Sequence, residues 1–357
     1  MLKISLAAIS LSLWFIALSA REVFPTPQLP YSPRVYTCYQ AVRNIAIDGR
    51  LDDPDWLDVP WSEDFTDIEG ELKPVPFLRT RFKMLFNEDG LLFGIEIAEP
   101  HIWATLTERD AVIFYDNDIE VFIDPNDDTH EYYELELNAL GTLWDLFLIK
   151  PYRDAHSPLN AWDIRDIEYA IGIDGTLNDP SDTDTGWTLE LLIPWEVLSE
   201  RAHMTIPPRE GDYWRINFSR VQWEADIIDG EYVKRPYVPE YNWVWSPQGL
   251  IAMHYPERWG YVFFSYQDPG DADYGIPASA APREYLRQLY YAQKQHWMDR
   301  GRFAKSLRRL QAKSYFHLGK KLKPSIETTS QSYIITLKGK GIPTLHIRED
   351  GLLWETE

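Results

Sequence analysis

Apolar and polar residues alternate with a period of two through most of the chain between residues 42 and 266. The clearest example is the pair of runs DIEVFID (118–124) and YYELELN (132–138), in which Ile119, Val121, Leu135 and Leu137 fall in phase. A period of two predicts β-strands that turn one face to a core and the other to solvent or to a ligand.

Similar short runs follow one another, separated by turn sequences such as NEDG (87–90), PNDD (125–128) and DPSDTDTG (179–186). This spacing predicts an all-β fold, an antiparallel, jelly-roll-like β-sandwich over residues 36–266. A hairpin is expected around the NEDG turn. Residues 194–202 begin with Pro194 and predict one short helix within the sandwich.

The pattern changes on both sides of this domain. Residues 21–35 hold four prolines and predict an extended leader, and residues 267–280 are rich in Gly, Pro, Ala and Asp, as in a linker. Residues 281–313 place apolar and aromatic side chains at helical spacing and are strongly basic. We therefore expect a C-terminal unit at 281–357, a basic helix with a short strand pair, whose helix contacts its own domain or another protein.

Residues 1–20 carry Lys3, then an apolar run from Leu6 to Leu18, then small residues. This pattern predicts a signal peptide that is removed on export. The alternative is a membrane anchor, but the run is shorter than the roughly 20 residues that span a bilayer, and no later stretch is long enough. Cys38 follows as the one cysteine of the chain, so no internal disulfide can form. A secreted or periplasmic bacterial protein is expected, without a membrane span after signal removal.

Composition narrows the choice of partners. The formal net charge of -21 disfavours nucleic acid, whose phosphates an acidic surface repels. Aromatic residues make up 14% of the chain, with 15 Trp, and flat amphipathic rings suit ring-shaped ligands such as sugars. The alternative is that most of these Trp fill the core.

The polar face of the two central runs holds the candidate ligand-binding residues. Carboxylates and amides at alternate positions can hold sugar hydroxyls, and paired carboxylates can also act as acid and base in glycoside hydrolysis. An ordinary solvated face remains the third reading. The candidates are Asn117, Asp118, Glu120, Glu136 and Asn138, with Phe114, Tyr115 and Trp144 as neighbouring rings and Trp243 and Trp245 in the run YNWVWSPQG (241–249).

The turn between the two runs, DPNDDTHE (124–131), gathers hard oxygen ligands. Asp124, Asn126 and Asp128 form a candidate Ca²⁺ site, although the loop lacks the Gly and Glu of an EF-hand and could be a plain acidic turn. The overlapping HEYYE (130–134) lacks the second His of the zinc-binding helix motif and lies in a strand-like run. No organic cofactor is expected.

Three motifs resemble carbohydrate-binding module family 9-like domains of exported proteins from Bacteroidetes-type bacteria. They are IAIDGRLDDPDW (45–56), DNDIEVFIDPNDD followed by YYELELNALGTLWDL (116–128 and 132–146), and WSPQG with MHYPERWGYVFF (245–249 and 253–264). The likeness covers residues 36–266. It implies a β-sandwich that clamps a sugar between two aromatic rings, with structural calcium nearby.

Carried over position by position, the resemblance makes Glu120 the sugar-binding glutamate and puts Phe114 near the first clamping ring. Glu136 stands where characterised modules place a binding Arg. The second ring has no clean match: Met253 or His254 falls near it, with Trp243 and Trp245 slightly earlier.

These observations favour an exported, non-catalytic carbohydrate-binding protein whose partner is an oligo- or polysaccharide. One alternative is a hydrolase or lyase that uses Glu120 with Glu136 or Asp118. The other is haem binding, as in some similar sandwiches. The conceivable axial ligands are Met84, Met253 and His254.

Overall fold

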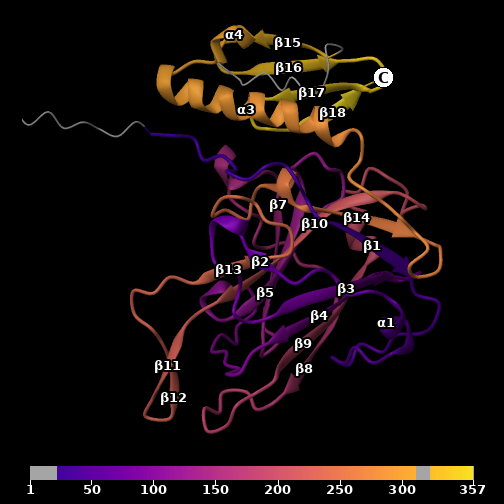
Figure 1. Cartoon of the computed structure of the whole chain (residues 1–357), viewed down its shortest axis with the longest axis vertical. Helices are drawn as coiled ribbons and strands as arrows, with labels where there is room; N and C mark the ends of the chain where they lie inside the picture. Colours follow the sequence, from indigo (N-terminus) through magenta and orange to yellow (C-terminus); the bar gives the residue numbers. More distant parts are fainter. Residues whose placement is uncertain (1–21, 311–321, 357) are drawn as a thin grey trace, which may run out of the picture.

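The computed structural model describes residues 22–310 and 322–356 (Figure 1). A large β domain occupies most of the molecule, and a small unit formed by the C-terminal residues lies at one end of it. The predicted signal peptide, residues 1–20, lies outside the described residues. Within the described ranges, no helix combines the length and the apolar character needed to cross a bilayer.

Twelve strands form one continuous curled sheet, in which β7-β6-β5-β10-β14-β1-β3-β4-β9-β8 follow in order and β13 and β2 branch from β10. Neighbouring strands are antiparallel, except that β1 runs parallel to both β14 and β3. This arrangement confirms the predicted all-β sandwich. The strands are β1 (Val35–Gln40), β2 (Thr66–Asp67), β3 (Thr80–Phe86), β4 (Gly90–Ala98), β5 (Asp118–Asp124), β6 (Tyr132–Asn138), β7 (Leu143–Leu148), β8 (Glu168–Asp174), β9 (Gly186–Pro194), β10 (Tyr213–Gln222), β13 (Tyr241–Val244) and β14 (Gly260–Ser265).

A short hairpin, short helices and 3-10 turns connect or flank the strands of this sheet. The hairpin of β11 (Ala225–Ile228) and β12 (Glu231–Lys234) projects from the domain as a separate arm (Figure 1). The predicted hairpin is β3 and β4, and the predicted helix after Pro194 is the single turn α2 (Trp195–Leu198). The remaining elements are α1 (Pro54–Asp58) and the 3-10 turns η1 (Gly70–Leu72), η2 (Ile113–Tyr115), η3 (Tyr152–Asp154) and η4 (Pro256–Arg258).

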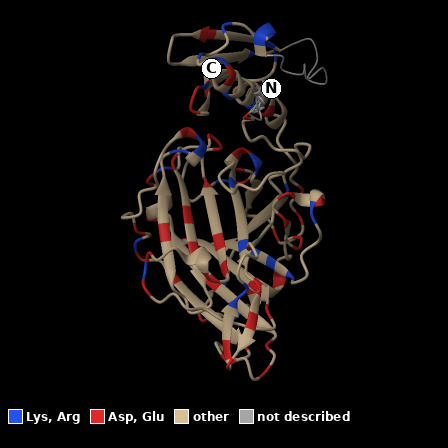
Figure 2. Ribbon diagram, turned by 90° about the vertical axis from the view of Figure 1, so that its left-hand side faces the viewer, with Lys and Arg blue, Asp and Glu red and all other residues tan. Residues whose placement is uncertain are grey.

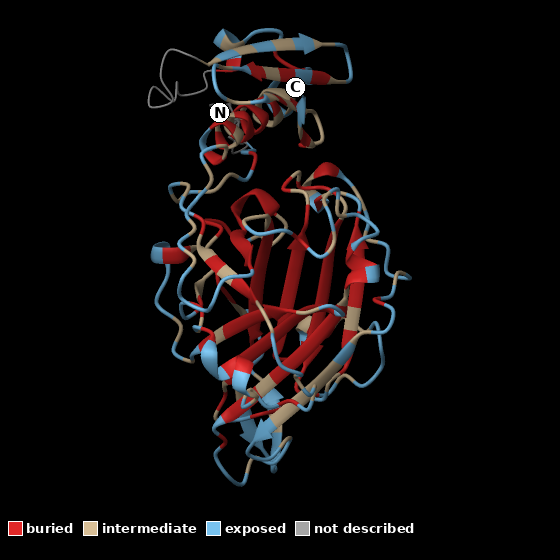
Figure 3. Ribbon diagram, turned by 90° about the vertical axis from the view of Figure 1, so that its right-hand side faces the viewer, coloured by how far each residue is buried: buried red, intermediate tan, exposed pale blue. Residues whose placement is uncertain are grey.

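The core lies inside the curled sheet, where Figure 3 shows nearly continuous burial along the strands. Ile119 and Val121 of β5 and Leu135 and Leu137 of β6 are completely buried in it. The opposite faces of β5 and β6 therefore carry their acidic residues, as the alternation predicts.

The C-terminal unit is larger than the predicted strand pair. It contains α3 (Ala280–Arg300), α4 (Leu307–Leu310) and a four-stranded antiparallel sheet of β15 (Lys323–Thr328), β16 (Tyr333–Lys338), β17 (Thr344–Arg348) and β18 (Leu353–Thr356). α3 ends earlier than the predicted position 313 because Gly301 adopts a left-handed conformation, with φ of 62°, that closes the helix.

The basic helix α3 binds the acidic turn between β5 and β6. Arg283 donates to the Asp127 carbonyl at 2.9 Å, and Arg287 donates to Thr129 Oγ1 at 3.1 Å and to the carbonyl of Gly351 in the β17–β18 turn. Arg287 is buried. The turn between the two central strands thus joins the sandwich to the C-terminal unit.

Candidate functional site

A row of polar side chains crosses the sheet on the face opposite the core. Glu120 of β5 pairs directly with Glu136 of β6 and with Ser219 of β10, and Glu136 pairs in turn with Trp144 of β7. Directly paired residues of antiparallel strands lie on the same face. Acidic positions recur along these strands in Figure 2. The structure therefore brings together the predicted residues Glu120, Glu136 and Trp144.

Asp118 adds a third carboxylate to this row. Oxygens of Asp118, Glu120 and Glu136 all lie within 4.8 Å of one another, a spacing that could hold a metal ion. All three residues are buried, and Glu120 keeps 7% of its surface exposed. Glu134, two residues before Glu136 on the same face, is buried beside them.

The burial of these groups, together with their proximity, raises their pKa values. Burial, with repulsion between the carboxylates, raises the pKa of Asp118, Glu134 and Glu136 well above the usual range. Burial raises the pKa of Glu120 to about 7, although the nearby Ser219 hydroxyl opposes the change. The cluster consequently favours protons or another cation over the free ionised state.

Half-buried and exposed aromatic rings border the carboxylates. Phe114 in η2 is linked to the cluster because its backbone N–H donates to Glu136 Oε2 at 3.1 Å. Its ring centre lies 6.5 Å from that of Trp144 and 4.9 Å from that of Tyr115. Tyr115 is 55% exposed. We call Phe114, Tyr115 and Trp144 the aromatic rim.

Asn117 and Asn138 are predicted site residues whose side-chain amides form hydrogen bonds with neighbouring loops and strands in the structure. Asn138 donates to the Leu106 carbonyl at 2.9 Å and accepts from the backbone N–H of Thr142 at 3.0 Å. Asn117 donates to Glu99 at 2.6 Å and accepts from the backbone N–H of Trp223 at 2.7 Å. Both amides hold the loops around the cluster in place.

The prediction that Trp243 and Trp245 contribute ring platforms is corrected by the structure. Both indoles are buried in the core cluster with Phe82 and Phe218. Their neighbour Val244 pairs with Ser219 and so shares the face of Glu120, which leaves the two Trp on the opposite face. Alternation separates Val244 from the two Trp, but the pairing of β13 with β10 decides which of the two faces meets the core.

His254 lies beside Glu134, at the end of the cluster nearer to the β5–β6 turn. Its Nδ1 shares a hydrogen bond of 2.8 Å with the Tyr132 hydroxyl, its Nε2 lies 3.9 Å from Glu134 Oε1, and its ring packs on Tyr152 with centres 4.4 Å apart. Burial and nearby Arg153 lower the pKa of His254 to about 3, so the imidazole is neutral at pH 7.

The conceivable haem ligands are dispersed. Met84 is completely buried in the core inside the curled sheet, whereas Met253 packs in a separate cluster with Trp259 and Trp144. His254 is bonded to Tyr132. The structure does not bring Met84 together with His254.

The predicted calcium residues form a turn that is satisfied internally. Asp124 accepts from the backbone N–H groups of Asn126 and Thr129 at 3.0 and 2.8 Å, and Asp128 accepts from that of His130 at 2.8 Å. The Asn126 amide is directed away, to Arg201 and His203. The geometry favours the acidic-turn reading over a calcium site at Asp124, Asn126 and Asp128.

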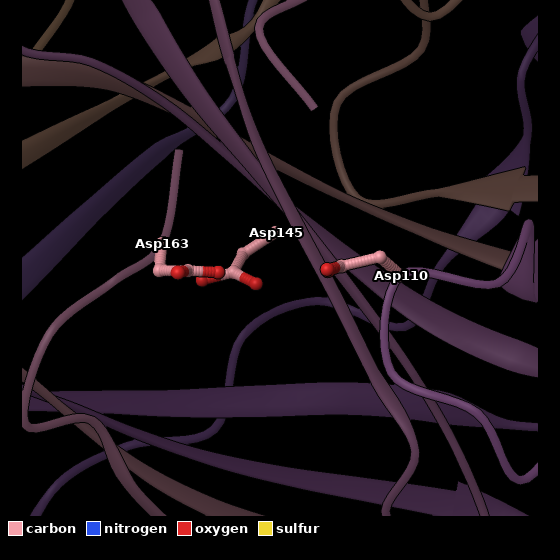
Figure 4. A group of neighbouring side chains, drawn as sticks. All are labelled: Asp110, Asp145 and Asp163. Atoms are coloured by element: carbon pink, nitrogen blue, oxygen red, sulfur yellow. The ribbon is translucent and has the colours of Figure 1, made fainter. Parts of the chain in front are cut away.

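A second carboxylate group consists of Asp110, Asp145 and Asp163, with oxygens also within 4.8 Å of one another (Figure 4). Arg109 already supplies a cation to it, because its guanidinium lies 2.6 Å from Asp145 and 3.3 Å from Asp163. Among the described carboxylate groups, the cluster on β5 and β6 is thus the one without such a cation.

Three further residues near the site are absent from the predicted set. Glu134 is in phase with Glu136, so the alternation marks it. Tyr152 and Glu240 approach from distant loops: Tyr152 is 41% exposed beside His254, and the charge of Glu240 acts on Glu120. No sequence spacing relates those two loops to β5.

The fold and site together define a β-sandwich with a carboxylate-and-aromatic face. Residues 73–262, more than half of the chain, match the model of Carbohydrate-binding family 9. The protein therefore belongs to that family, as the motifs predict.

Solved structures with a similar fold share little sequence with this chain. A protein from Bacteroides uniformis ATCC 8492, provisionally assigned as carbohydrate-binding, aligns with a TM-score of 0.48 at 17% identity, over 66% of this chain and 100% of its own. Family 9 modules from Caldicellulosiruptor kristjanssonii with cellotriose and with glucose align with TM-scores of 0.42 and 0.41, at 15% and 16% identity, each over 68% of this chain and 100% of their own. No curated protein matches the chain.

Proposed function

We propose that this protein is an exported, non-catalytic carbohydrate-binding protein, and that it binds glycans at the carboxylate cluster and aromatic rim. The observation that carries the proposal is the meeting of buried carboxylates with two half-buried rings, Phe114 and Trp144, and the exposed ring of Tyr115 at one place on the sandwich. Membership of Carbohydrate-binding family 9 supports the same conclusion.

The two parts of the site suit the two surfaces of a sugar. A pyranose ring presents C–H groups on its flat faces, which pack on aromatic rings, and hydroxyls at its edge, which donate to carboxylate oxygens. Trp144 pairs directly with Glu136 in the sheet. A sugar lying on Trp144 would therefore direct its edge toward Glu136 and Glu120.

Calorimetric titration with neutral and charged oligosaccharides tests the proposal. Trp144→Ala is the diagnostic variant, and Trp354→Ala is its matched control, because Trp354 is also a half-buried indole but lies on β18 of the C-terminal unit. We expect Trp144→Ala to weaken binding about tenfold or more, equivalent to about 1.4 kcal/mol, and Trp354→Ala to leave it unchanged. Absence of binding to every saccharide would refute the proposal.

Export is part of the proposal and rests on residues 1–20. In a bacterial host, the mature protein is expected in the periplasm or medium with a mass that lacks this segment. Intact-mass measurement of fractionated protein tests this. A full-length protein in the cytoplasm would contradict it.

Glycoside hydrolysis is the second candidate, because Glu120 has a pKa near 7 and faces Glu136. A general acid needs a pKa near the working pH, and two close carboxylates are the usual pair for glycoside cleavage. If this function holds, Glu120→Gln abolishes release of reducing ends and spares binding. Wild-type protein that binds a glycan without cleaving it would exclude hydrolysis of that glycan.

A further inference from the structure

The candidate site concentrates negatively charged side chains. Four carboxylates, those of Asp118, Glu120, Glu134 and Glu136, occupy one face of two adjacent strands and are all more than nine-tenths buried. Burying even one ionised carboxylate without a partner is costly, and burying several together adds their repulsion. A sandwich surface has no need of such a cluster for its own folding.

The cluster also has unused hydrogen-bonding capacity. Asp118 Oδ2 and Glu134 Oε2 are buried and have no hydrogen-bond partner, although Asp118 and Glu134 are only 1% and 4% exposed. Within residues 22–310 and 322–356, the ion-pair contact to these carboxylates is His254 Nε2 at 3.9 Å from Glu134, and that imidazole is neutral at pH 7. The carboxylates therefore lack a cation from the described chain.

The spacing of three of these carboxylates is compatible with a primary ammonium. An ammonium nitrogen about 2.8 Å from three acceptors in tetrahedral directions places those acceptors about 4.6 Å apart. The oxygens of Asp118, Glu120 and Glu136 lie within 4.8 Å of one another. A primary ammonium could thus donate one hydrogen bond to each of the three.

The exposure of the site limits how a ligand enters. Glu120, at 7% exposed, is the most open of the carboxylates, so a whole sugar ring cannot descend among them. Tyr115 at the rim is more than half exposed, and Phe114 connects that rim to Glu136 through its backbone N–H. The arrangement suits a ligand that places a ring on the rim and a small charged group between the carboxylates.

We propose that the site selects amino sugars with a free amine, holding the ammonium among Asp118, Glu120 and Glu136 while the sugar ring packs on the aromatic rim. This inference rests on the proposed carbohydrate binding and names its ligand class. Acetylation of the amine removes its charge and adds bulk, so N-acetylated sugars are poor ligands. Neutral glucans lack the cation and bind weakly.

A divalent cation is the competing occupant, since three carboxylates also suit Ca²⁺. A metal ion alone would make no use of the aromatic rim. The two occupants are separated by supplying each in turn.

The test is calorimetric titration of the full chain with tetramers of glucosamine, N-acetylglucosamine and glucose, at about pH 7, where an amine is still largely protonated and the Glu120 carboxyl begins to ionise. Each titration is run with EDTA and repeated with CaCl₂. We expect the glucosamine tetramer to bind at least about tenfold more tightly than either of the others, with or without Ca²⁺. Glu136→Gln should remove most of this preference, whereas Glu88→Gln, in the exposed β3–β4 turn, should retain it.

Each other outcome overturns the inference in a distinguishable way. Equal affinity for the three tetramers would refute amine selection and leave carbohydrate binding intact. Binding of the glucose tetramer that requires Ca²⁺ would identify the cluster as a metal site. Failure of every saccharide would refute the proposed function as well. Because the comparison of tetramers uses the wild-type chain, it does not depend on the folding of any variant.

Discussion

Glu120→Gln should stabilise the sandwich above neutral pH. Burial raises the pKa of Glu120 from 4.5 to about 7, and 1.36 kcal/mol corresponds to each tenfold change in proton affinity, so ionising this side chain in the fold costs about 3 kcal/mol. A neutral amide avoids that cost and keeps nearly the same shape.

The sign follows from proton linkage. An acid with a raised folded pKa contributes stability that is complete below its unfolded pKa of 4.5 and is lost as the pH rises through about 7. Wild-type protein therefore loses this stability between about pH 5 and pH 8, and the glutamine variant does not. The difference between the two should widen by about 2–3 kcal/mol over that range.

Urea denaturation in EDTA, followed by tryptophan fluorescence at several pH values, measures this difference. Similar m values in the two proteins would show that the same transition is compared. Glu88→Gln is the matched control because Glu88 is exposed in the β3–β4 turn, and its effect should be small at every pH. A difference between wild type and Glu120→Gln that does not change with pH would refute the electrostatic reasoning.

Three further predictions concern the C-terminal unit and the core. Arg287→Ala removes buried hydrogen bonds between α3, the acidic turn and the β17–β18 turn, so it should cost about 2–4 kcal/mol and accelerate limited proteolysis of the C-terminal unit. Burial disfavours the ionised form of Glu257, but the positive charge of Arg153 more than offsets the effect of burial and lowers the pKa of Glu257 to about 2. The contribution of ionised Glu257 to the free energy of unfolding is present above pH 4.5 and should disappear as the pH falls toward 2. Acid titration of Glu257→Gln, monitored by circular dichroism, should lack that loss. Gly260→Ala would place a methyl carbon 2.0 Å from the Trp245 ring and should lower the midpoint of thermal unfolding by several degrees, and an unchanged midpoint would contradict the packing shown here.

Local sequence predicted the strands of the site well, because alternation reports which residues share a face of one strand. The pairing of β5 with β6 also follows, since a short turn joins them and fixes which residues can face each other. The same reasoning failed for Trp243 and Trp245. Their strand, β13, pairs with β10 rather than with a sequence neighbour, and that pairing decides which face meets the core.

The acidic turn between β5 and β6 was predicted as a candidate Ca²⁺ site, but arginine side chains of α3 contact it in the structure. Asp124, Asn126 and Asp128 have the composition of a cation-binding loop, and composition alone cannot reveal a cation supplied by the chain itself. Arg283 and Arg287, more than 150 residues later, bind this turn. Charge complementarity between the acidic sandwich and the basic helix was visible in sequence, but the contact was not.

The sequence by itself determined the all-β class, the family and the acidic face of β5 and β6, because each depends on residue type and short-range periodicity. Tertiary structure alone decided that the acidic face is buried, that Asp118 and Glu134 keep unpartnered oxygens there, and that Tyr152 and His254 stand beside them. Burial and pKa depend on which distant segments cover a side chain, and this coverage is set by long-range packing that no local pattern encodes.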